Sequence, residues 1–136
     1  MFALDSNVII DFLNKKSTVV AALDSAVYQK VPLAIPSFVE YEISRGFLYC
    51  PSKQKEMTYK QLRIRCRILE TNAAIWRCAA SIWASLRHAG RTLGDADILI
   101  AACCLVNGYT LVTHNTKDFV AIATKSFDEL RLIDWI

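Results

Sequence analysis

The sequence predicts an α/β fold, a three-layer α/β/α sandwich around a mainly parallel sheet, formed as a single domain over residues 1–136. Short apolar runs alternate with longer segments of helical periodicity along the whole chain, as is typical of parallel sheets covered by helices. A length of 136 residues is enough for one domain with a sizeable core. The hydrophobic fraction of 54% excludes a disordered chain.

Five apolar runs are short enough, and well enough bounded, to be strands. The first ends at Asp5, the second lies between Pro32 and Pro36, and the fourth follows the turn Asn107-Gly108. The predicted strands cover residues 1–4, 33–35, 67–69, 109–113 and 130–135.

The segments between these runs carry helical spacing and capping residues. Ser6 or Asn7 is predicted to cap a helix that ends at Leu13, and Ser37 to cap a helix over residues 38–50. Thr71 or Asn72 is predicted to cap a long helix that reaches Ala89 and is ended by Gly90. The other helices are predicted over residues 17–30, 53–67, 97–107 and 116–123. The helix over residues 97–107 is apolar all round, so we expect it to be buried.

Two tryptophans, Trp76 and Trp83, lie seven residues apart on the long helix and therefore near one face. Packing in the core or in a dimer is a more ordinary use of such a pair than base stacking. The sequence thus predicts an apolar contact here.

The sequence shows no sign of export. The N-terminus lacks a basic leader, and the longest apolar run, residues 98–106, has about half of the ~20 residues that a membrane helix needs. The five cysteines are odd in number and form no C-x-x-C pair, which favours reduced, buried thiols over a zinc site. We therefore expect a cytoplasmic protein with no membrane contact.

The net charge of +3 is too mild to indicate a nucleic-acid partner by itself. Its distribution is more informative, because residues 53–67 hold six basic side chains opposed only by Glu56. Two interpretations stay open for this segment: a solvated helix face or a surface that contacts RNA.

Four acids stand at the ends of predicted elements or among core residues. Asp5 follows the first strand, where open α/β sheets bind ligands, Asp97 opens the buried helix, and Asp118 follows the polar loop after the fourth strand. Glu42 falls within the apolar face of its helix, whereas Glu40 points away. Glu42 is therefore either a functional carboxylate or the partner of a neighbouring base such as Arg45.

All four acids can converge on one edge of the sheet, and four carboxylates in one pocket repel each other unless they are protonated or bind cations. Ligands made only of hard oxygen atoms suit Mg²⁺ or Mn²⁺ better than Zn²⁺. Such ions activate water and neutralise phosphate charge, so the cluster predicts phosphodiester hydrolysis. Phosphate-binding glycine loops and the serine nucleophile motif are missing from the sequence.

Four segments, in this order, resemble the PIN-domain ribonucleases, and most closely the VapC toxins of bacterial type II toxin–antitoxin pairs. They are Leu4-Asp5-Ser6-Asn7-Val8, Tyr41-Glu42-Ile43 with Gly46, Asp95-Ala96-Asp97 running into Ile100-Ala101-Ala102, and Val112-Thr113-His114-Asn115 with Asp118-Phe119. The resemblance covers nearly the whole chain, while residues 51–75 match only loosely.

The resemblance implies a Mg²⁺- or Mn²⁺-dependent endoribonuclease that is a homodimer and is inhibited by a VapB-type antitoxin. It assigns catalysis and metal binding to Asp5, Glu42, Asp97 and Asp118, with Asp95 as an additional ligand or a helix cap. Supporting positions are Ser6, Asn7, Thr113 and Asn115. We expect Lys53, Arg63 and Arg91 to contact the RNA backbone without reading its sequence.

Two alternatives remain open. The first is a phosphatase or phospho-receiver with Asp5 as nucleophile, but the haloacid-dehalogenase pattern D-x-D is broken by Asn7. The second is a non-catalytic PIN-like module that binds nucleic acid.

Overall fold

Five strands form one parallel sheet at the centre of the protein, which is described here from a computed structural model covering residues 1–123 and 130–136. The order across the sheet is β3-β2-β1-β4-β5, so the first strand lies in the middle. The strands are β1 (Phe2–Leu4), β2 (Leu33–Pro36), β3 (Cys66–Leu69), β4 (Thr110–Val112) and β5 (Leu132–Ile133). Every strand pairing is parallel, which confirms the predicted fold class.

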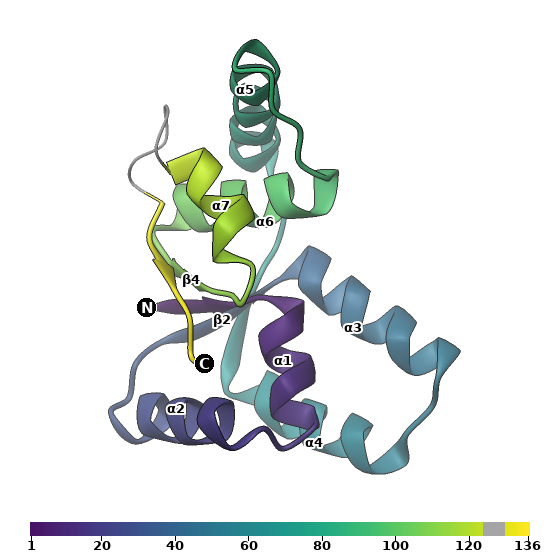
Figure 1. Ribbon diagram of the computed structural model, residues 1–136. Helices are drawn as coiled ribbons and strands as arrows, with labels where there is room; N and C mark the ends of the chain where they lie inside the picture. The colour runs from purple at the N-terminus through teal and green to yellow at the C-terminus, as the bar shows by residue number, and fades with distance from the viewer. Residues whose placement is uncertain (124–129) are drawn as a thin grey trace.

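Helices cover both faces of this sheet (Figure 1). On one side lie α5 (Ala73–His88), α6 (Asp95–Asn107) and α7 (Thr116–Ala123), and on the other lie α1 (Ser6–Leu13), α2 (Ser17–Tyr28) and α4 (Lys53–Ile64). The remaining helix, α3 (Ser37–Tyr49), runs from the sheet out to the side. None of the helices in the described ranges is long and apolar enough to span a membrane.

Helix α6 is the buried centre of its layer, as its all-apolar sequence predicts. Six of its side chains are buried, and small residues such as Ala101 and Cys104 let it pack closely between α5 and the sheet. The helix ends at Gly108, whose φ of 71° is the left-handed conformation that glycine adopts without strain. It begins two residues earlier than predicted, at Asp95.

Two predicted caps are wrong. Helix α1 is capped by Asp5, whose Oδ1 accepts a hydrogen bond from the backbone N–H of Ser6 at 2.8 Å, and not by Ser6 or Asn7. Helix α3 begins at Ser37 itself, after Pro36, and has no side-chain cap. The prediction for α5 is confirmed, because the Asn72 side chain accepts from Ile75 N–H at 3.0 Å.

The ends of four helices also differ from prediction, those of α3 and α5 by a single residue. Helix α2 ends at Tyr28 because Lys30 takes a φ of 57°, and α4 ends at Ile64, where the chain turns into β3. The predicted apolar face of α3 is buried only in its first half. Tyr49 is 93% exposed because the end of α3 extends beyond the sheet (Figure 1).

Candidate active site

The site begins where two neighbouring strands end. Parallel pairing sets Leu4 of β1 against Val112 of β4, and the backbone N–H of Asp5 donates to the Val112 carbonyl at 3.0 Å. Asp5 and Thr113 are therefore the first residues beyond the two strands. The Thr113 hydroxyl donates to Asp5 Oδ2 at 2.8 Å, and both residues are buried.

Burial raises the pKa of Asp5 above its usual value, since the charged carboxylate loses its hydration. Hydrogen bonds from the Thr113 hydroxyl and from Ser6 lower the pKa and offset part of that effect. The fold thus holds an acid in a place where its charge is costly, with donors arranged to stabilise the ionised form.

Two more predicted acids share this environment. The pKa of Glu42 is raised by burial and by the charge of Asp5, and that of Asp97 is raised by burial and by the charges of Asp5 and Asp118. The charge of Asp5 thus acts on Glu42 of α3 and on Asp97 of α6, and the charge of Asp118, at the start of α7, acts on Asp97.

The sequence left Glu42 as either a functional carboxylate or the partner of Arg45, and the structure has features of both. Its Oε2 lies 3.8 Å from the Arg45 guanidinium, a long ion pair with a partner that is 58% exposed. Its Oε1 is buried and has no hydrogen-bond partner among residues 1–123 and 130–136. A buried, unpaired carboxylate oxygen beside other acids is the arrangement that a cation would satisfy.

The loop after β4 connects the supporting residues. The Thr113 hydroxyl accepts from the backbone N–H of Asn115 at 3.0 Å and from the Asn7 amide at 3.5 Å. The Asn115 side-chain amide donates to Asp118 Oδ2 at 2.9 Å. Hydroxyl and amide donors thus orient two of the four carboxylates.

The donor set fits a hard divalent cation. It consists of carboxylate oxygens, one of which lacks a hydrogen-bond partner in the described part of the chain, with hydroxyl and amide groups around them. Within residues 1–123 and 130–136, however, no three His, Cys, Asp or Glu side chains are arranged closely enough to hold one ion between them. A cation here would be held partly through water, as Mg²⁺ commonly is, or by a small shift of these side chains.

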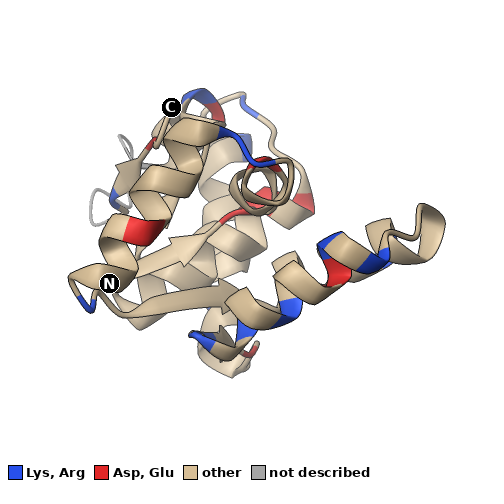
Figure 2. Cartoon of the chain, turned by 90° about the horizontal axis from the view of Figure 1, so that it is seen from below, with Lys and Arg blue, Asp and Glu red and all other residues tan. Residues whose placement is uncertain are grey.

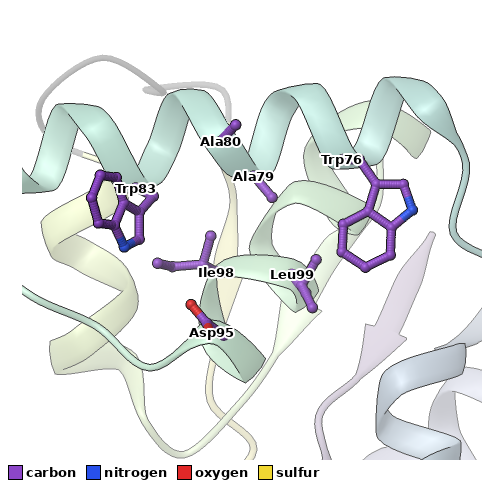
Figure 3. A pocket seen from close by; sticks show the side chains of 7 residues that line it. All are labelled: Trp76, Ala79, Ala80, Trp83, Asp95, Ile98 and Leu99. Atoms are coloured by element: carbon purple, nitrogen blue, oxygen red, sulfur yellow. The ribbon is translucent and has the colours of Figure 1, made fainter.

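Asp95 lies apart from this cluster. It lines a pocket of about 430 Å³ between α5 and α6, together with apolar residues of both helices (Figure 3). Trp76 and Trp83 stand at the two ends of this pocket and are 53% and 45% exposed, so they are not core residues. The structure leaves this apolar face uncovered.

Basic side chains are spread along α4 (Figure 2). Arg63 is held by Glu40, with its Nε 2.6 Å and its Nη2 3.0 Å from the two carboxylate oxygens, and Lys55 donates to Asn14 at 2.7 Å. Lys53 on α4 and Arg91 in the loop before α6 are exposed. Of the three expected RNA contacts, Arg63 is thus engaged within the protein.

Sequence reasoning did not single out the ring of His114. Its Nδ1 lies 2.7 Å from Asp134 and its Nε2 lies 2.9 Å from Asp11. The spacing of Asn7 and Asp11, one helical turn apart, was the signal that both face the same loop.

The fold and the site together define an α/β domain with acids gathered at the carboxyl edge of a parallel sheet. Residues 2–125 match the model of the PIN domain, and the chain belongs to the PIN-domain family. This confirms the resemblance on which the sequence prediction rested.

Known proteins similar to this chain span nearly its full length. Ribonuclease VapC2 of Rickettsia felis is 28% identical over 125 residues, which cover 90% of this chain and 92% of the relative. Ribonuclease VapC1 of Haemophilus influenzae is 27% identical over 139 residues, which cover 99% of this chain and 98% of the relative.

Solved structures agree with this match. The crystal structure of VapBC2 from Rickettsia felis, bound to a DNA fragment from its promoter, gives a TM-score of 0.80 at 28% identity, covering 99% of this chain and 98% of that one. The structure of VapBC-1 from nontypeable Haemophilus influenzae gives 0.81 at 26% identity, covering 98% and 97%.

Proposed function

We propose that this protein is a Mg²⁺- or Mn²⁺-dependent endoribonuclease and the toxin of a toxin–antitoxin pair. The observation that carries the proposal is the group of mutually repelling carboxylates around Asp5, in a chain whose relatives are named ribonucleases. An activity on cellular RNA would be exerted in the cytoplasm, where we propose that the protein acts.

A bound divalent ion would supply an activated water and neutralise charge on the scissile phosphate. Asp5 and Asp97 would hold the ion, and Asp118 would complete the cluster. The raised pKa of Glu42 suits a group that accepts a proton from the attacking water, because burial and the charge of Asp5 make this carboxylate hold a proton more strongly than an exposed one does. Thr113 and Asn115 would keep the carboxylates of Asp5 and Asp118 oriented.

Cleavage of RNA by the purified protein tests this proposal. We expect discrete fragments with Mn²⁺ or Mg²⁺, none with EDTA, and none from Asp5→Asn. The matched control is Asp24→Asn, which changes an exposed acid on α2 and should cleave normally. Cleavage by Asp5→Asn, or cleavage in EDTA, would contradict the proposal.

We propose a VapB-type antitoxin as the protein partner, since the similar structures are of VapBC complexes. A groove of about 230 Å³ between α1 and α3 supports this partner, because apolar residues such as Ile10 and Phe47 line it and lead to Glu42. A protein segment that filled this groove would reach the acid cluster. Co-expression with a small DNA-binding protein encoded beside this gene should abolish both cleavage and growth arrest.

A homodimer is also proposed, and the uncovered face at Trp76 and Trp83 is the surface that supports it. Sedimentation of the wild type and of Trp83→Arg tests this, with loss of the dimer expected in the variant. Exposed Lys53 and Arg91 remain proposed contacts to the RNA backbone.

The second candidate function is that of a non-catalytic module that binds nucleic acid. It is favoured by one observation, that no three acids in the described residues are arranged to hold an ion. RNA binding in Mn²⁺ without cleavage, by folded protein free of its partner, would decide for it.

A further inference from the structure

His114 joins three segments that are far apart in the sequence. It lies in the loop between β4 and α7, and its side chain is only 14% exposed. Its Nδ1 meets Oδ1 of Asp134, just after β5, at 2.7 Å, and its Nε2 lies 2.9 Å from Oδ2 of Asp11, on α1. The ring therefore bridges the first helix and the end of the chain.

Both ring nitrogens of His114 face carboxylate oxygens. Nδ1 lies within hydrogen-bond distance of Asp134, and a ring nitrogen that carries a hydrogen can donate to such an oxygen. The Nε2 contact to Asp11 is as short as an ion pair but is not aligned as a hydrogen bond.

Other charged groups lie near the ring. Asp11 also pairs with Lys16 at 3.4 Å, and His114 is among the groups that lower the pKa of Asp5. Slight burial raises the pKa of Asp134, but hydrogen bonds from His114 and from the backbone N–H of Ile136 outweigh it and lower that pKa overall. The carboxylate at this end of the bridge is therefore stabilised in its ionised form.

The same loop holds the acid site on either side of His114. The backbone N–H of His114 donates to Asn7 Oδ1 at 3.3 Å, and Asn7 in turn reaches the Thr113 hydroxyl that binds Asp5. On the other side, Asn115 binds Asp118. The position of the loop relative to α1 thus fixes the donors to two carboxylates.

We propose that His114 is a positioning residue for the acid cluster. Its ring clamps the loop between Asp11 and Asp134, so that Thr113 and Asn115 meet Asp5 and Asp118 at bonding distance. The inference rests on the proposed function of the same site, and it adds a residue whose ring contacts Asp11 and Asp134 and not the carboxylates of that site.

The test measures Mn²⁺ binding by calorimetry, without RNA, and amide hydrogen exchange in residues 113–118. For His114→Gln we expect about a tenfold rise in the Mn²⁺ dissociation constant, by analogy with residues that orient metal ligands, and faster exchange in the loop. The control is His88→Gln, the other histidine of the chain, which is exposed on α5 and should change neither.

Two further variants keep the test decisive if His114→Gln does not fold. Asp11→Asn and Asp134→Asn each remove one charge that faces the ring but keep the side chain's shape, and each should weaken Mn²⁺ binding by a few-fold. Unchanged Mn²⁺ affinity and unchanged loop exchange in the folded variants would overturn the role of His114. A wild type that binds no Mn²⁺ would instead refute the metal-dependent function. Amide hydrogen exchange in residues 113–118 of the wild type and the His114 variant would then decide whether His114 holds the loop in place.

Discussion

Replacing Thr113 by valine removes one hydroxyl from the centre of the site without changing the shape of the side chain. That hydroxyl donates to Asp5 Oδ2 at 2.8 Å and accepts from the Asn115 N–H at 3.0 Å, and Thr113 is fully buried. A hydrogen bond to a charged group contributes about 1.5–3 kcal/mol, and an orphaned N–H costs about 1–3 kcal/mol. Because Asn115 is only half-buried and water can replace part of the loss, we expect ~2–4 kcal/mol of destabilisation at pH 8.

The effect should depend on pH. The pKa of Asp5 is raised by burial and lowered by this hydrogen bond, so the variant raises it further. The destabilisation is fully present where Asp5 is ionised, and it shrinks as the pH falls through the pKa of Asp5 in the folded variant, because a protonated carboxyl needs the donor less.

Urea denaturation in EDTA at pH 8 and pH 5 measures both quantities. The control is Thr110→Val, which makes the same exchange at a half-buried position of β4, and it should stay within about 1 kcal/mol of the wild type. An unchanged stability of Thr113→Val at pH 8, or a loss that grows on acidification, would refute the reasoning.

Three further outcomes are expected. Asp97→Asn should abolish RNA cleavage yet stabilise the metal-free protein at pH 8. The pKa of Asp97 is raised in the folded protein, so its ionised form lowers the stability of the wild type, which recovers that stability as the pH falls through this pKa. Denaturation curves in EDTA measure the gain, and a variant less stable than the wild type would contradict it. Mn²⁺ at 100 times its dissociation constant should stabilise the wild type by about 2.7 kcal/mol, seen as a higher Tm, and the shift should vanish in Asp5→Asn. Ile75→Ala, which truncates a fully buried side chain of α5, should cost about 2–5 kcal/mol in urea denaturation, whereas Ile64→Ala at an 84% exposed position should cost under about 1 kcal/mol.

The parts of this fold that sequence predicted are those set by local patterns. Apolar runs that end in acids marked the strands, and the apolar helix after Asp97 could only be buried, so the parallel sandwich followed. Helix ends were less predictable because backbone details decide them. Asp5 caps α1, although the sequence predicted only a role in the site for this residue. Helix α2 ends early because Lys30 has a positive φ.

The contacts missed from sequence were those between distant segments. Thr113 meets Asp5 across 108 positions of the chain, and His114 meets Asp134 at the far side of a strand. No spacing rule covers such pairs, because they depend on which strands become neighbours. The exposure of Trp76 and Trp83 was open for the same reason, since a helical stripe alone does not say what covers it.

Asp5 serves the fold and the site with the same carboxylate, since one oxygen caps α1 and the other receives the Thr113 hydroxyl. Asparagine caps helices about as well as aspartate and carries no buried charge. A single change to the amide should therefore remove the proposed activity while leaving the architecture intact. In any population where the activity harms its host, inactive copies of this gene should arise whose products are full-length and well folded. Selection could then distinguish active from inactive copies only by their activity, because both fold equally well.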